Sequence, residues 1–110
     1  MATDPLALAE GLDWLRPVDR QFGRAIARRA RHDPDTVALV AALACAELGA
    51  GHLCLDPDDP GAAGGRLGEL LPTDRLLAVL RTEEGVCQLP GDATARPLVL
   101  DGRRVYLHRY

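Results

Sequence analysis

The chain has 110 residues and a mass of 11.8 kDa, with 47% hydrophobic and 26% charged residues. A chain of this length supports one small hydrophobic core, and this composition is too apolar for wholesale disorder. No apolar run approaches the roughly 18 residues that a membrane span needs, and the N-terminus lacks a secretory signal. We therefore expect a single domain over residues 1–110, without a membrane segment, in the cytoplasm.

The charge is unevenly distributed along the sequence. All 13 basic residues are Arg, and the 16 acids give a formal net charge of −3. Five of the arginines lie in residues 20–31, a segment without acids. The chain is therefore not a polycation, but it carries one locally basic segment.

Capping signals and apolar periodicity predict four helices. The first covers residues 4–16 and ends at Pro17, and the second covers residues 19–31. Asp33 and Pro34 mark the start of the third, in which residues 37–48 are almost all apolar and so predict a central, enclosed helix ended by Gly49 and Gly51. The fourth begins at Thr73–Asp74 and ends near Gly85.

The second helix is predicted to have two distinct faces. Its apolar side comprises Val18, Phe22, Ala25 and Ile26. Its cationic side comprises Arg20, Arg24, Arg28 and Arg31. Arg29 projects into the apolar arc, so we expect a buried stem and a carboxylate or helix-terminal carbonyl at its head.

The C-terminal third changes to β-type patterning. Residues 52–55 predict a short extended segment, followed by a Pro- and Gly-rich loop over 56–65. Residues 98–100 and 105–107 flank Asp101–Gly102, which favours a type I′ hairpin with Leu98, Leu100, Val105 and Leu107 on one face. The predicted fold class is therefore α+β, mainly α: a small bundle of about four helices with a C-terminal β-hairpin.

Several kinds of chemistry are excluded by the sequence. It contains no GxxxxGK[ST] phosphate loop, no GxGxxG after a strand and no serine, so we expect no catalytic residue and no cofactor in this chain. Three cysteines, odd in number and without a CxxC pair, argue against disulfides and predict reduced core residues.

Metal sites are weakly supported. His52 and Cys54 could face one metal with Cys45, Cys87 or His108, but a strong zinc signature has two ligand pairs. An acidic turn at Asp56, Asp58 and Asp59 lacks the spacing of a calcium loop. Core cysteines and a solvated turn are the favoured interpretations.

The candidate contact residues are basic or aromatic. Arg20, Arg24, Arg28 and Arg31 could contact phosphates, or could form a solvated face or pair with acids of a neighbouring subunit. Trp14 and Tyr110 are the candidate anchors for a protein partner, since large rings are enriched at interface centres. Tyr106 and Tyr110 could stack on bases, although a domain interface fits their strand spacing better.

Four segments resemble one protein family in order and spacing. They are LRPVDRQFGRAIARRA (residues 15–30), ALACAELGAGHLCLDP (42–57), LLAVLRTEEGV (76–86) and PLVLDGRRVYLHRY (97–110). Together they resemble the N-terminal domain of RecD, the alpha chain of the bacterial RecBCD enzyme, exodeoxyribonuclease V. The Pro- and Gly-rich residues 56–65 depart from that pattern, and no motif marks the residues that face RecC.

This resemblance implies a helical domain that precedes a superfamily-one helicase motor and anchors it to RecC-like and RecB-like subunits. The longer subunit would be an ATP- and Mg-dependent 5′ to 3′ DNA helicase in double-strand-break repair by recombination, with DNA contacted mainly by its motor domains. The chain ending at Tyr110 would be a piece of that subunit without an ATPase of its own.

Two other functions remain open on the sequence alone. The first is a free-standing DNA-binding regulator that uses the arginines of the second helix. The second is a small metalloprotein built around Cys54.

Overall fold

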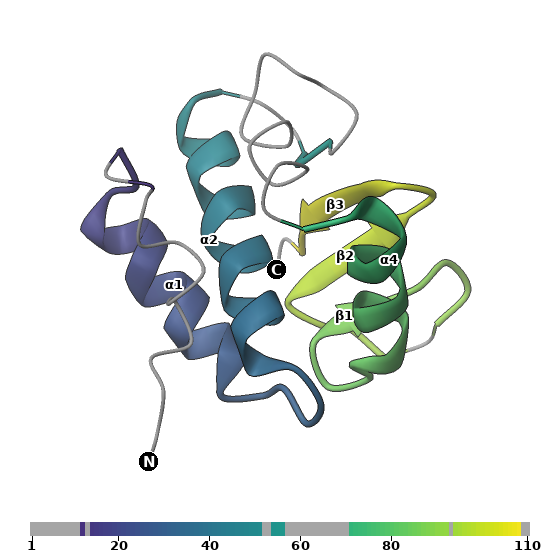
Figure 1. Cartoon of the computed structure of the whole chain (residues 1–110). Coiled ribbons are helices and arrows are strands. Elements are labelled where there is room, and N and C mark those ends of the chain that lie inside the picture. Colours follow the sequence, from purple (N-terminus) through teal and green to yellow (C-terminus); the bar gives the residue numbers. More distant parts are fainter. Residues whose placement is uncertain (1–11, 13, 52–53, 57–70, 93, 109–110) are drawn as a thin grey trace.

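The computed structural model describes Leu12 and residues 14–51, 54–56, 71–92 and 94–108. These residues form α1 (Pro17–Ala27), α2 (Pro34–Gly49), α4 (Thr73–Thr82), β1 (Cys87–Gln88), β2 (Leu98–Asp101) and β3 (Arg104–Leu107) (Figure 1). The predicted α+β class is confirmed. The predicted bundle of four helices is wrong, because the described part of the chain holds three helices and a three-stranded sheet.

The α2 helix lies at the centre, with α1 on one side and the sheet and α4 on the other (Figure 1). Its residues 36–44 and Glu47 are buried, which confirms the predicted enclosed helix. The Asp33 side chain caps α2 by accepting a hydrogen bond of 3.1 Å from the Thr36 backbone N–H, and Pro34 occupies the first helical turn. Both start signals therefore act as predicted.

Pro17 begins α1, whereas the sequence pattern predicted that it ends a helix. Residues 4–11 and 13 of that predicted helix lie outside the described residues, and residues 14–16 form a turn. Arg16 is the extended N-cap residue, and Asp19 accepts a 2.9 Å hydrogen bond from its backbone N–H. This is the reciprocal half of a capping box, and proline is well tolerated directly after such a cap.

The buried face of α1 is rotated from the predicted one. Asp19, Gly23, Ile26 and Ala27 are buried, whereas Val18 is 54% exposed and Ala25 is exposed. The cause is the close approach of the two helices at Gly23, where a Cβ atom would lie 2.6 Å from the Ala38 carbonyl oxygen. Small residues set this contact, so Val18 and Ala25 lie outside the packed face, while Ile26 remains in the core.

The sheet is mixed. The predicted hairpin forms from β2 and β3, which pair Leu98 with Leu107 and Leu100 with Val105, so these four residues share one face as predicted. Its turn is not type I′, because Gly102 alone has a positive φ, 64°, and it is the first central residue, which is the type II′ pattern. The sequence did not predict β1, a two-residue strand that pairs in parallel with β2.

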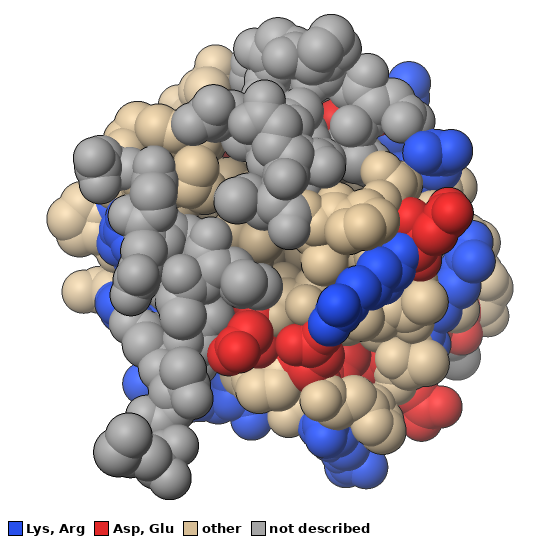
Figure 2. Space-filling model, in the orientation of Figure 1, with Lys and Arg blue, Asp and Glu red and all other residues tan. Residues whose placement is uncertain are grey.

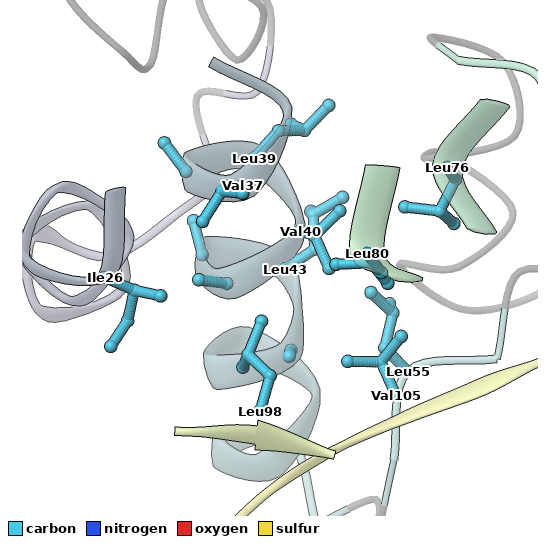
Figure 3. Packing of buried hydrophobic residues seen from close by; sticks show 14 of the residues in the cluster. Ile26, Val37, Leu39, Val40, Leu43, Leu55, Leu76, Leu80, Leu98 and Val105 are labelled. Atoms are coloured by element: carbon cyan, nitrogen blue, oxygen red, sulfur yellow. The ribbon is translucent and has the colours of Figure 1, made fainter. Parts of the chain in front are cut away.

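The core joins the helices to the sheet. Val40 and Leu43 of α2 point toward Leu80 of α4, and Leu55 lies beside Val105 (Figure 3). Leu55 forms an isolated antiparallel bridge with Val105, which agrees with the predicted extended segment where it is described. Most of the predicted 56–65 loop lies outside the described residues.

The contact at Gly23 generates a test of the α1–α2 packing. Gly23→Ala gains about 1 kcal/mol of helix propensity, but its methyl group overlaps the Ala38 backbone. We expect urea denaturation to show a net loss of about 1–2 kcal/mol, with the exposed Gln21→Ala control within about 0.5 kcal/mol of wild type. A stabilising Gly23→Ala substitution would contradict the close approach.

Candidate interaction surface

The arginines predicted to form one cationic stripe occupy different environments. Arg20 and Arg24 are half-buried on α1, and the Arg20 guanidinium donates a hydrogen bond of 2.9 Å to the Leu12 carbonyl. Arg28 is the exposed C-cap residue of α1, and Arg31 lies beyond the helix in the loop leading to α2. The stripe therefore does not extend to Arg31, because α1 ends four residues earlier than predicted.

Arg29 was predicted to have a buried stem, with a carboxylate or helix-terminal carbonyls at its head. It is exposed, so the predicted burial is wrong. Helical periodicity does not carry to this position, because α1 ends at Ala27. No carboxylate among the described residues pairs with the Arg29 guanidinium. Arg29 is therefore an exposed cation just beyond the end of α1.

Of the two predicted aromatic anchors, Trp14 lies among the described residues. Trp14 is 48% exposed and lies just before α1. With Val18 and Leu48, it is one of three large apolar residues that are exposed in the described part of the chain. Tyr110 lies outside the described residues. Exposed rings of this kind are suited to bury area against a partner.

The loop between α1 and α2 is held by one buried carboxylate, which the sequence pattern did not single out. Glu83 is the C-cap residue of α4 and is 1% exposed. Its Oε1 accepts a 2.8 Å hydrogen bond from the Arg31 backbone N–H, and its Oε2 accepts one of 2.8 Å from Asp33. The His32 N–H lies 3.1–3.2 Å from both oxygens.

These hydrogen bonds determine the ionisation of Glu83. Burial alone would raise the pKa of this carboxyl, but the backbone N–H donors of Asp33, Arg31 and His32 outweigh it and hold the pKa below its ordinary value of 4.5. Glu83 is therefore charged at neutral pH and fixes the backbone at Arg31, His32 and Asp33.

A pocket of about 340 Å³ lies beside this loop, lined by Arg29, Arg31 and Arg96 together with Glu84 and Gly85. The Arg96 guanidinium donates to the Glu84 carbonyl, and the Arg96 backbone N–H lies 3.4 Å from the Gln88 side-chain oxygen. Three guanidinium groups from two distant segments thus line one pocket, with one carboxylate among them. We call it the arginine pocket.

The rest of the visible charge is mixed. Figure 2 shows basic and acidic side chains interspersed on the face that carries α4. Asp56 is one of the acids considered for a calcium loop, and its Oδ2 lies 3.5 Å from Nε of Arg104. Asp58 and Asp59 lie outside the described residues. This face has no continuous cationic stripe among its described residues.

The cysteines show no metal-binding arrangement where they are described. Cys45, Cys54 and Cys87 are free, and only Cys87 is fully buried. Burial, followed by the hydrogen bond and charge of Asp19, raises the pKa of Cys45 to about 11, and burial likewise raises that of Cys87 to about 11. No group of three His, Cys, Asp or Glu side chains in the described residues could hold a metal ion, and His52 lies outside them.

Most of the sequence matches the model of one known protein family. Residues 11–106 match the model of the RecBCD enzyme subunit RecD, N-terminal domain. The chain belongs to this family. The match covers nearly the whole RecD-type domain described above, from the turn before α1 to β3, and confirms the resemblance found in the sequence.

None of the curated proteins compared with this RecD-type domain matches it. None of its described helices has both the length and the apolar character needed to cross a membrane.

The Glu83 contacts generate a stability prediction. Glu83→Gln keeps the side-chain shape but turns an amide NH₂ toward backbone N–H donors. We expect the free energy of unfolding, measured by urea denaturation at neutral pH, to fall by about 2–3 kcal/mol. The exposed neighbour provides the matched control: Glu84→Gln should change it by no more than about 0.5 kcal/mol.

A comparison of wild type with Glu83→Gln at different pH values tests the pKa of Glu83. A carboxyl whose folded-state pKa is depressed stabilises the fold above its unfolded pKa and loses this contribution as the pH falls through the folded-state pKa. The advantage of wild type over Glu83→Gln should therefore be full above pH 4.5 and shrink below it. A difference that stays constant or grows on acidification would show that Glu83 is not held charged by the loop.

Proposed function

We propose that this chain is the N-terminal interaction domain of a RecD-like helicase subunit and anchors that subunit in a RecBCD-type complex. The observation that carries the proposal is the family match over residues 11–106. In this role the domain binds other subunits, chiefly a RecC-like subunit and secondarily a RecB-like one. The complex then acts in double-strand-break repair by recombination.

The distribution of exposed residues supports a role in protein binding. Trp14, Val18 and Leu48 are large apolar side chains that are 42–54% exposed. Such residues contribute to affinity when a partner covers them, whereas arginines at the rim mainly steer the encounter. Trp14 and Tyr110 are the proposed anchors, and Arg20, Arg24, Arg28 and Arg31 are proposed to contact acids of a partner or, in the alternative below, phosphates.

The remaining functional assignments belong to the longer subunit. ATP and Mg are expected to bind its motor domains, because this sequence has no phosphate loop. DNA is expected to be contacted mainly by those motor domains. The proposed compartment is the cytoplasm, where RecBCD-type complexes meet broken chromosomal DNA.

The alternative is a DNA-binding regulator that uses the α1 arginines. Its support is the locally basic segment over residues 20–31. The Arg20 guanidinium, however, already donates to a backbone carbonyl, and the net charge of the chain is −3. Negative charge elsewhere on the surface repels a phosphate backbone.

A paired binding experiment tests the proposal. We expect the isolated chain to retain the RecC-like subunit of the same organism in a pull-down, and to bind duplex DNA only weakly at about 150 mM salt, where screening reduces non-specific contacts. We expect Trp14→Ala to weaken retention about tenfold or more, and the exposed Gln21→Ala control on α1 to leave it within about twofold. Tight duplex binding with no retention of the RecC-like subunit would reject the anchoring function and favour the regulator.

A further inference from the structure

We propose that a groove between α1, the C-terminal end of α2 and the end of β3 binds an apolar side chain of the partner subunit, and that acidic residues beside that side chain enter the adjoining arginine pocket. This inference rests on the proposed anchoring function and adds to it the location and the chemistry of the contact.

The groove has a volume of about 410 Å³ and is predominantly apolar. Phe22 and Ala25 of α1 line one part of it, and Leu48 of α2 and Leu107 of β3 line another. These α1 residues belong to the apolar arc that the sequence pattern placed in the core. In the structure, Ala25 of this arc is exposed, and Leu48 of α2, which also lines the groove, is 42% exposed. No described residue therefore fully covers the groove.

The groove continues into the arginine pocket. Arg29 lines both cavities, while Pro97 in the groove directly follows Arg96 in the pocket. An occupant that fills the groove therefore lies next to three guanidinium groups and one carboxylate, Glu84. The local excess of positive charge calls for more than one negative group from the occupant.

The combined chemistry favours a protein segment over nucleic acid. A phosphate backbone gains nothing from an apolar groove. The two aromatic rings that line it among the described residues, those of Phe22 and His108, are both half-buried and so are poor stacking platforms. A peptide with a large aliphatic or aromatic residue beside two acids matches both cavities. Carboxylates also pair well with guanidinium groups, through two parallel hydrogen bonds.

The backbone at residues 31–33 and the Arg96 side chain of the arginine pocket are held in place before any partner binds. Glu83 fixes the backbone of residues 31–33, and the Glu84 carbonyl accepts a hydrogen bond from Arg96. Preorganisation of this kind reduces the entropy lost on binding. The occupant therefore meets a formed site, which is suited to a defined segment of sequence.

Photo-crosslinking identifies the occupant. The chain would carry p-benzoylphenylalanine in place of Ala25, be assembled with the RecC-like subunit and irradiated, and the crosslinked peptide would be identified by mass spectrometry. We expect a peptide of the RecC-like subunit with a large apolar residue and at least two acids within a few positions of it. A crosslink to nucleic acid, to a second copy of this chain or to a peptide without acids would overturn the inference.

Charge reversal at Arg29 tests the arginine pocket without a bulky probe. Arg29→Glu is expected to weaken binding of the RecC-like subunit at least tenfold, while Arg103→Glu, the same reversal at the exposed hairpin turn, should change it less than twofold. Replacing one of the partner's acids near the crosslinked position by Arg should restore binding to Arg29→Glu. Both variants should keep the wild-type midpoint of urea denaturation.

The two proposals fail in different ways. Binding of the RecC-like subunit that is unaffected by Arg29→Glu would overturn the groove inference and leave the anchoring function standing. Absence of binding by the wild-type chain would reject the anchoring function, and the groove inference with it.

Discussion

The buried carboxylate of Glu83 is the interaction on which the arrangement of the domain depends. It lies at the end of α4, yet its hydrogen-bond donors are backbone N–H groups about 50 residues earlier in the chain. A charged carboxylate with several backbone donors is stable in a buried site, whereas the same carboxylate without them is costly. Glu83 therefore links α4 to the loop that sets the direction from α1 into α2.

The position of this loop has consequences on both sides. Asp33, whose N–H binds Glu83, also caps α2 through its side chain, so one residue joins the loop to the central helix. On the outer side, Arg31 extends from the fixed backbone and lines one pocket with Arg29 and Arg96. A structural contact thus builds the cationic half of the proposed docking surface, and the uncovered apolar arc of α1 builds the other half.

The parts of the fold that local sequence determines were predictable. The N-cap of α2, its apolar surroundings and the shared face of the hairpin leucines and Val105 each follow from neighbouring residues. The orientation of α1 was not, because apolar periodicity cannot reveal that Gly23 allows a closer approach than larger residues do. Pro17 was predicted to end a helix, whereas it begins α1, because the N-cap residue of α1 is Arg16 and not a usual capping residue. The local sign of the helix start was the acid at Asp19. Neither β1 nor the Glu83 contacts have a local signature, since their partners are distant in sequence. For the site, the basic segment and Trp14 were named from the sequence as candidates and stay predictions, while the grouping of Arg29 and Arg31 with Arg96 required the tertiary structure.

Native-state amide hydrogen exchange of the wild-type chain tests this account most directly, at the backbone amides of Arg31, His32 and Asp33. Loop amides exchange rapidly unless a stable contact holds them. If Glu83 clamps the loop, these three amides exchange as slowly as those in the middle of α2, since they are released only when the core opens. Exchange of all three at the rate of an unstructured peptide, while α2 stays protected, would contradict the account.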